Sequence, residues 1–114
     1  MTKSTPFFAD FLGWRCQILT ARYASGKLAL LLVDADDDQP VATATVSLDV
    51  QPRHDCVLIK TWSENAGIDE ALITAGVLEP GVIARHPTGF AEALEYRLTT
   101  EFMKTLAVQK ILSD

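Results

Sequence analysis

The sequence has few cysteines, and the two that it has form no recognisable motif. Cys16 and Cys56 are the only cysteines in 114 residues. They make no CxxC pair and have no histidine at the spacing of a zinc site. This pattern excludes a dense disulfide framework, and it indicates two free thiols in a reducing cytoplasm.

Long hydrophobic runs and an excess of basic residues are also missing. No apolar run approaches the roughly 20 residues that a membrane-spanning helix needs. The N-terminal stretch MTKSTPFFADFLGW is interrupted by Asp10 and is a poor signal peptide. Ten basic residues stand against fifteen acidic ones, a formal net charge of −5. The sequence therefore predicts a cytoplasmic protein that binds neither a membrane nor nucleic acid directly.

The remaining composition is that of an ordinary globular chain. Hydrophobic residues make up 48% of it and charged residues 22%, which argues against disorder. The length permits a single hydrophobic core without disulfides or metals. We therefore expect one domain over residues 1–114, made of an N-terminal segment (1–13), a central unit (14–98) and a C-terminal segment (99–114).

The N-terminal segment, residues 1–13, is predicted to be a short aromatic helical lid. Thr5 can cap a helix, and Pro6 suits the first helical position. Apolar residues recur four positions apart between Phe7 and Leu12 and would share one face of that helix. Gly13 would end it.

Residues 14–60 alternate with a period of two, which is typical of β-strands. Short links between the strands favour an antiparallel meander. The second strand is apolar on both faces, which indicates a central strand covered on both sides. The expected strands are Arg15–Tyr23, Lys27–Asp34, Val41–Leu48 and His54–Lys60.

The stretch SENAGIDEALITAGVL predicts a central helix. Asn65 can cap it, and Asp69 and Glu70 lie in the first turn, where the helix dipole favours acidic residues. Gly76 can adopt the left-handed conformation that ends many helices.

The last third of the chain allows two interpretations. The stretch FAEALEYRLTTEFMKTLAVQKIL fits one long helix, and it also fits a strand, Phe90–Leu98, followed by a helix capped at Thr99. Helix propensity favours the long helix. The segment after Thr99 is helical in both, and its apolar residues cover more surface than one core needs. It therefore predicts a homodimer, with Phe102, Leu106, Val108 and Leu112 as the candidate self-association residues.

Four aspartates lie between two predicted strands in LLLVDADDDQPVATATV. Asp34, Asp36 and Asp38 match the first three ligand positions of an EF-hand calcium loop. The glycine position of that loop is Gln39 here, and the position of its bidentate glutamate is Thr45. Because aspartate and Gln-Pro are common turn formers, we interpret the segment as a solvated turn. The sequence predicts no metal and no other cofactor.

The same acidic residues are candidates for contact with a protein partner. Asp36, Asp37 and Asp38 form a small acidic epitope that could block a basic groove. The acids of the whole chain are too scattered for a mimic of DNA. Trp62 and Glu64 lie just before the predicted helix and are further candidates, since tryptophan is enriched in interfaces.

Nucleophilic catalysis has one candidate pair, His54 and Cys56. On a strand, two residues separated by one position point to the same face. No oxyanion-hole motif and no third orienting group accompany them. We therefore expect a protein that is not an enzyme, with a small hydrolase as the minor alternative.

Three stretches carry a resemblance to a known family. They are ASGKLALLLVDADDDQPVATATVSL, VLIKTWSENAGIDEALITAGVLE and HPTGFAEALEYRL, which together cover roughly residues 14–98. This order resembles a family of small uncharacterised bacterial proteins, a domain of unknown function carried on plasmids, phages and conjugative elements. The resemblance implies that Phe90–Leu98 is a strand and that residues 99–114 are an appended helix. It supplies no catalytic residues.

Together these observations predict an α+β fold and a binding function. We expect an antiparallel meander of about five or six strands, one central helix packed on it, and short helical extensions at both termini. The expected function is that of a non-enzymatic, protein-binding accessory protein of a mobile genetic element. Its sharper form is an inhibitor of a host defence system through an acidic surface. A small self-associating structural protein is the alternative.

Overall fold

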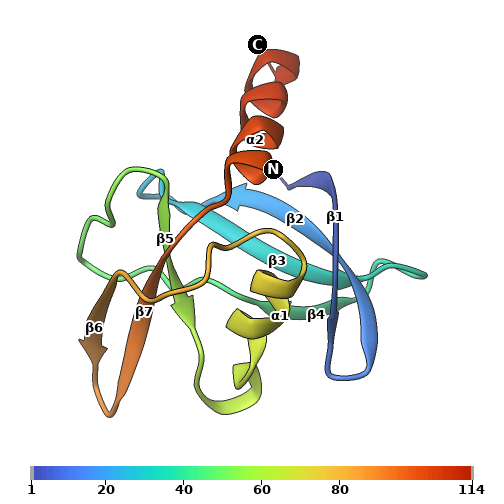
Figure 1. Ribbon diagram of the computed structural model, residues 1–114. Coiled ribbons are helices and arrows are strands. Elements are labelled where there is room, and N and C mark those ends of the chain that lie inside the picture. Colours follow the sequence, from blue (N-terminus) through green and yellow to red (C-terminus); the bar gives the residue numbers. More distant parts are fainter. Residues whose placement is uncertain (1, 114) are drawn as a thin grey trace.

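The computed structural model describes residues 2–113 of the chain, with side chains up to Gln109. Within that range the chain forms two antiparallel sheets and two α-helices (Figure 1). The prediction of the α+β class is confirmed. The prediction of one meander of five or six strands is not, because the strands divide into a four-stranded and a three-stranded sheet.

The first sheet is a meander of four consecutive strands in chain order. Residues 16–22 of its second strand pair without interruption with residues 28–34 of its third. Ile18, Leu30 and Leu32 are fully buried on one face of these two strands. The strands are β1 (Lys3–Phe11), β2 (Trp14–Arg22), β3 (Leu28–Asp34) and β4 (Pro40–Thr43).

The N-terminal segment is strand β1, so the predicted helical lid is wrong. The Thr5 hydroxyl caps no helix; it donates to the carbonyl of Ile18 at 2.8 Å. The register shifts between Ser4 and Phe8, and this irregularity accommodates Pro6, which has no N–H to donate to the ladder. A helix of so few residues is marginal by itself, whereas β1 gains a ladder of hydrogen bonds with β2.

The second sheet has the strand order β5-β7-β6. The chain enters it directly from the first sheet, through a bridge between Thr45 and Ile59. The predicted strand Val41–Leu48 is therefore divided between the two sheets. At the division, the Thr45 hydroxyl accepts a hydrogen bond from the Leu30 amide at 3.1 Å, in place of a backbone carbonyl. The strands are β5 (Cys56–Lys60), β6 (Ala84–Thr88) and β7 (Ala91–Arg97).

A short 3-10 helix, η1 (Ser63–Asn65), and helix α1 (Ile68–Thr74) follow β5. Asn65 does not cap α1; its side-chain amide donates to the Thr43 carbonyl at 2.7 Å. Gly67 takes the cap position with a φ of 87°. Gly76 follows the helix with a φ of 82°, which is the left-handed conformation predicted for it.

The last third of the chain is a strand followed by helix α2 (Thr100–Ser113), so the long-helix interpretation is wrong. Strand β7 is paired on both sides, with β5 and with β6, and this pairing outweighs the helix propensity of its residues. Thr99 is the predicted cap: its hydroxyl accepts from the Phe102 amide at 3.1 Å. Helix α2 projects from the body of the molecule (Figure 1).

The core lies between the two sheets, α1 and the first turns of α2. Its fully buried side chains include Ile18, Leu30, Leu32, Ile59, Ile68, Leu72 and Phe102. None of the helices within residues 2–113 has the length and apolar character needed to cross a membrane.

Candidate partner-binding surface

The acidic segment of residues 34–39 is a turn held by its own side chains. The carboxylate of Asp34 accepts from the Asp36 amide at 2.8 Å, and that of Asp37 accepts from the Gln39 amide at 3.0 Å. Asp34 is buried, whereas Asp36, Asp37 and Asp38 are exposed. The three exposed carboxylates therefore face solvent at the end of β3. No group of three acidic, histidine or cysteine residues suited to a metal ion occurs in the described part of the chain.

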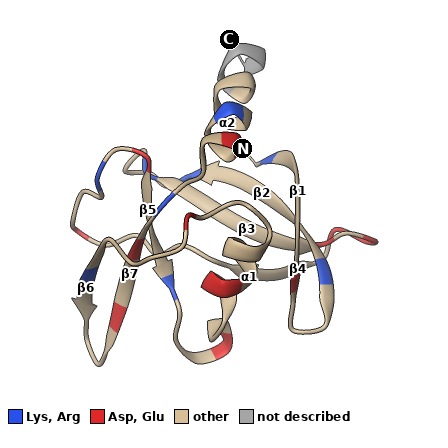
Figure 2. Cartoon of the chain, in the orientation of Figure 1, with Lys and Arg blue, Asp and Glu red and all other residues tan. Residues whose placement is uncertain are grey.

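An exposed apolar turn lies beside the acidic one. Leu12 and Trp14, at the tip of the β1–β2 hairpin, are 60% and 53% exposed. The carbonyl of Arg15 accepts from the Ala35 amide at 2.9 Å, which holds this hairpin next to the start of the acidic turn. Asp10 pairs with Arg15 across the same hairpin at 3.4 Å. We call this surface the hairpin end and define it as Asp10, Leu12, Trp14, Asp36, Asp37 and Asp38. Figure 2 shows the acidic residues of the loop between β3 and β4 in red.

The backbone at the tip of this hairpin is unusual. Leu12 has a φ of 54° and Gly13 a φ of 80°, the pattern of a two-residue turn with both central residues left-handed. Glycine adopts that conformation freely, but leucine rarely does. Leu12 therefore exposes an apolar side chain and has a backbone conformation that costs free energy. Such outliers concentrate at binding sites.

A hollow of about 440 Å³ lies between β1 and α1, next to the hairpin tip. Phe8 and Leu12 line it together with Asp10 and Glu70. The hairpin end therefore combines exposed apolar side chains, a hollow and an acidic border. Sequence reasoning missed Leu12 and Trp14. Gly13 between two alternating segments is the signal that could have indicated a turn there.

Trp62 and Glu64, the other predicted partner-binding residues, form a local group with Lys60. The Lys60 ammonium lies 5.8 Å from the centre of the half-buried Trp62 ring and 2.9 Å from a carboxylate oxygen of Glu64. The hydrogen bond from Lys60 lowers the pKa of Glu64 to about 2. This group follows β5 of the second sheet. The structure does not bring it together with residues 36–38, which follow β3 of the first (Figure 1).

His54 and Cys56 do not form a nucleophile and base pair. His54 precedes strand β5, and its highly exposed imidazole lies 2.9 Å from the Asp55 carboxylate. Cys56 is buried, and burial raises the pKa of its thiol. The Glu95 carboxylate adds to that rise, through its charge and a hydrogen bond. The raised pKa keeps the thiol in the less reactive protonated form.

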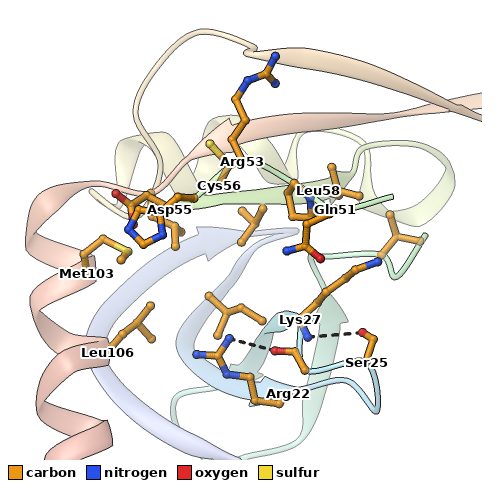
Figure 3. A pocket seen from close by; sticks show the side chains of 17 residues that line it. Arg22, Ser25, Lys27, Gln51, Arg53, Asp55, Cys56, Leu58, Met103 and Leu106 are labelled. Carbon is orange, nitrogen blue, oxygen red and sulfur yellow. Dashed lines mark hydrogen bonds and ion pairs between the residues drawn. The ribbon is translucent and has the colours of Figure 1, made fainter. Parts of the chain in front are cut away.

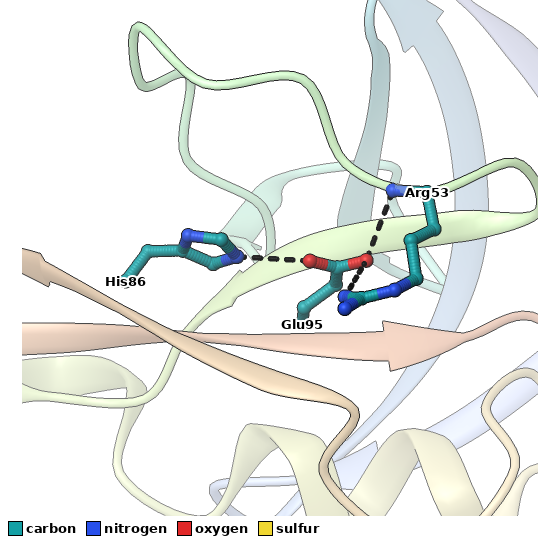
Figure 4. Close-up of polar contacts among 3 residues, drawn as sticks. All are labelled: Arg53, His86 and Glu95. Atoms are coloured by element: carbon teal, nitrogen blue, oxygen red, sulfur yellow. Dashed lines mark hydrogen bonds and ion pairs between the residues drawn. The ribbon is translucent and has the colours of Figure 1, made fainter.

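Glu95 is a buried carboxylate that sequence reasoning missed, only 1% exposed on β7. One oxygen lies 2.8 Å from Nε2 of His86. The other accepts from the backbone amide of Arg53 at 2.9 Å and from its guanidinium at 3.2 Å (Figure 4). Burial acts to raise the pKa of Glu95, but the hydrogen bonds from His86 and Arg53 outweigh it and lower the pKa. The hydrogen bonds between Arg53 and Glu95 hold the loop before β5 on the second sheet.

The four residues predicted to mediate self-association lie in different environments. Phe102 is fully buried within its own chain and is unavailable to a second copy. Leu106 is half-buried, and Val108 is 54% exposed. The side chain of Leu112 lies outside the described residues.

No family model, no curated protein and no solved structure matches this chain. The resemblance to proteins of mobile genetic elements therefore stays a prediction, and any function has to be argued from the surface of the molecule itself.

Proposed function

We propose that the chain is a non-enzymatic, protein-binding accessory protein of a mobile genetic element, and that it binds its partner through the hairpin end. One observation carries the proposal: the exposed Trp14 precedes Arg15, whose carbonyl accepts from the Ala35 amide at 2.9 Å, next to the exposed acidic residues 36–38. Tryptophan anchors are common at the centre of interfaces, and charged borders direct the encounter of partners.

The chemistry of the hairpin end defines the partner. The charge of Asp10 is balanced by its ion pair with Arg15. The net negative charge of this surface therefore comes from the three carboxylates of the acidic turn. The partner is therefore a protein with a basic groove next to an apolar pocket that receives Trp14. A nuclease of a host defence system has such a groove because it binds phosphates. Inhibition of such an enzyme is the sharper form of the proposal.

The test is a pull-down from lysate of the native host with the full chain as bait and with salt raised stepwise during washing. The bait variant carries Asp36→Asn, Asp37→Asn and Asp38→Asn. Asparagine keeps the shape of these side chains and tolerates the left-handed φ of 61° at Asp38. We expect the wild-type chain to retain one stoichiometric protein that elutes as salt rises, since screening weakens exposed charge pairs. The variant should lose it.

A matched control removes the same amount of charge elsewhere. Glu79, Glu92 and Glu101 are exposed and lie outside the hairpin end, so their triple change to glutamine is the control bait. Retention by this control and loss by the aspartate variant would locate the contact. Equal retention by all three baits would contradict the proposal. Trp14→Ala and Trp62→Ala, used as separate baits, decide which tryptophan is the anchor, and we expect Trp14.

Self-association through α2 is the second candidate, and the exposed Val108 favours it. Deleting residues 99–114 would be a poor test, because it also removes the buried Phe102 from the core. Val108→Asp changes only the exposed face. If α2 forms the interface, sedimentation velocity should show a dimer for the wild-type chain and a monomer for this variant.

A further inference from the structure

A groove unrelated to the hairpin end runs beneath helix α2. Figure 3 shows Arg22 and Lys27 on one wall, Met103 and Leu106 of α2 on the second, and Gln51, Asp55 and Cys56 on the third. This hollow has a volume of about 580 Å³. A second hollow of about 640 Å³ shares Arg22, Leu28, His54, Met103 and Leu106 with it. The two hollows are therefore neighbours, and we call them together the groove.

The lining of the groove is aliphatic. Leu28, Met103 and Leu106 are half-buried against the core and keep part of their surface open to the groove. Leu58 and Leu98 lie deeper and are buried. Met103 and Leu106 belong to α2, whose apolar residues cover more surface than one core needs.

The rim of the groove is positively charged in a chain that is negative overall. Among the residues whose side chains are described, four basic residues line it, against one acidic residue, Asp55. The Asp55 carboxylate lies 2.9 Å from the imidazole of His54, which balances its charge only when it is protonated. The concentration of positive charge is therefore local and opposes the net charge of the protein. The four basic residues are Lys3, Arg22, Lys27 and Arg53.

Three of these cations have neutral hydrogen-bond partners. Arg22 donates to the Gly26 carbonyl at 3.3 Å, Lys3 donates to the Gln109 carbonyl at 3.3 Å, and Lys27 donates to the Leu48 carbonyl. A carbonyl oxygen satisfies a donor but leaves the positive charge uncompensated. Arg53 differs, since its guanidinium is paired with Glu95. The field in the groove thus comes mainly from Lys3, Arg22 and Lys27.

We infer that this groove binds a fatty acid, with its carboxylate at Arg22 and its chain along Leu28, Met103 and Leu106. An arginine fork matches a carboxylate in geometry. Each of the two hollows, of about 580 and 640 Å³, has a volume within the range of small-molecule sites, about 300–1,000 Å³. An extended peptide fits less well, because β2 and β3 are hydrogen-bonded to each other up to Arg22 and Leu28 and leave no strand edge there for a peptide to join.

This ligand site is independent of the proposed function. Strands β2 and β3 join the two surfaces: the acidic turn follows β3 at Asp34, and Arg22 and Leu28 lie at the other end of the same strand pair. If the experiments contradict one of the two proposals, the other is unaffected.

The test is isothermal titration of the full chain with sodium dodecanoate below its micellar concentration. Dodecyltrimethylammonium has the same chain with a cationic head, and acetate has the same head without the chain. We expect dodecanoate to bind one per chain and the other two at least tenfold more weakly. Backbone amide shifts in ¹⁵N NMR spectra should change around Leu28 and Met103.

Two variants locate the site. Arg22→Gln removes a groove cation, and Lys104→Gln removes one charge from an exposed position of α2 outside the groove. We expect Arg22→Gln to weaken dodecanoate binding about tenfold and Lys104→Gln to leave it unchanged. Leu106→Gln, checked for its fold by circular dichroism, should weaken it as well.

Three outcomes would overturn the inference. Equal binding of dodecanoate and dodecyltrimethylammonium would mean nonspecific binding of apolar chains. Equal binding by Arg22→Gln and Lys104→Gln would place the head group elsewhere. A glutamate-rich helical peptide that shifts the groove amides when dodecanoate does not would assign the groove to a protein partner.

Discussion

The ring of Phe7 packs edge-on against the ring of Phe102, with the ring centres 5.1 Å apart and an interplanar angle of 64°. Phe7 belongs to β1 and Phe102 to α2, so this contact joins the two ends of the chain. Phe102 is fully buried. The two terminal segments, which the sequence presents as additions to a central unit, are therefore both part of the core.

Phe102→Ala should lower the free energy of unfolding by about 3–5 kcal/mol, because it leaves a cavity where a fully buried ring stood. Urea denaturation monitored by circular dichroism measures this. Phe90→Ala is the matched control: Phe90 is fully exposed on the β6–β7 turn, so its loss should change stability by less than about 0.5 kcal/mol. Similar effects of the two substitutions would contradict the packing described.

Glu95→Gln should lower stability by about 1–3 kcal/mol at neutral pH, since it weakens the hydrogen bonds of a buried carboxylate. Arg53 and His86 would lose a charged acceptor. Glu92→Gln is the control, because Glu92 is exposed on the same strand and its ion pair with Arg85 is at the surface.

The contribution of Glu95 should also depend on pH. Its pKa is lowered in the folded protein, so the stabilisation is complete above the pKa of an unfolded glutamate, about 4.3. It is lost as the pH falls below that value through the folded pKa. The stability difference between wild type and Glu95→Gln, measured in urea at several pH values, should therefore shrink on acidification. A constant difference would show that the charge of Glu95 is not what stabilises the loop.

Tyr96 should ionise late in a spectrophotometric titration at alkaline pH. Burial raises the pKa of Tyr96 to about 12, and the hydrogen bond from its hydroxyl to Asp69, at 2.7 Å, adds to the rise. Tyr96→Phe should remove that late transition from the absorbance curve. Because the folded pKa is raised, the stabilisation is present below about pH 10 and lost as the pH rises through 12. A tyrosinate transition near pH 10 that disappears in the variant would contradict the contact.

Thr99→Ala should lower stability by about 0.5–2 kcal/mol, the usual cost of losing a helix cap. The Thr99 hydroxyl also donates to the Gly76 carbonyl at 2.6 Å, which ties the start of α2 to the end of α1. Thr99→Ser keeps the hydroxyl and should restore most of the loss in thermal unfolding. Equal loss in both variants would point to the methyl group instead of the hydrogen bonds.

Several local features of the fold could be predicted from the sequence because their causes are local. The left-handed Gly76 and the capping Thr99 depend on residues within a few positions of themselves. The alternation of β2 predicts a strand with one buried face, and the apolar residues on both faces of β3 predict a central strand. Asp34 and Asp37 hold the acidic turn by accepting hydrogen bonds from amides two positions further along the chain.

The tertiary structure decided the features that depend on distant partners. Residues 3–11 carry helix signals but become a strand, because β2 supplies a ladder that a short isolated helix cannot match. Glu95 is buried only because His86 and Arg53, from a neighbouring strand and a loop, compensate its charge. Trp14 lies beside the acidic turn because β2 and β3 pair in one register. The sequence by itself determined the turns, caps and strand periods, whereas long-range pairing decided which side chains meet.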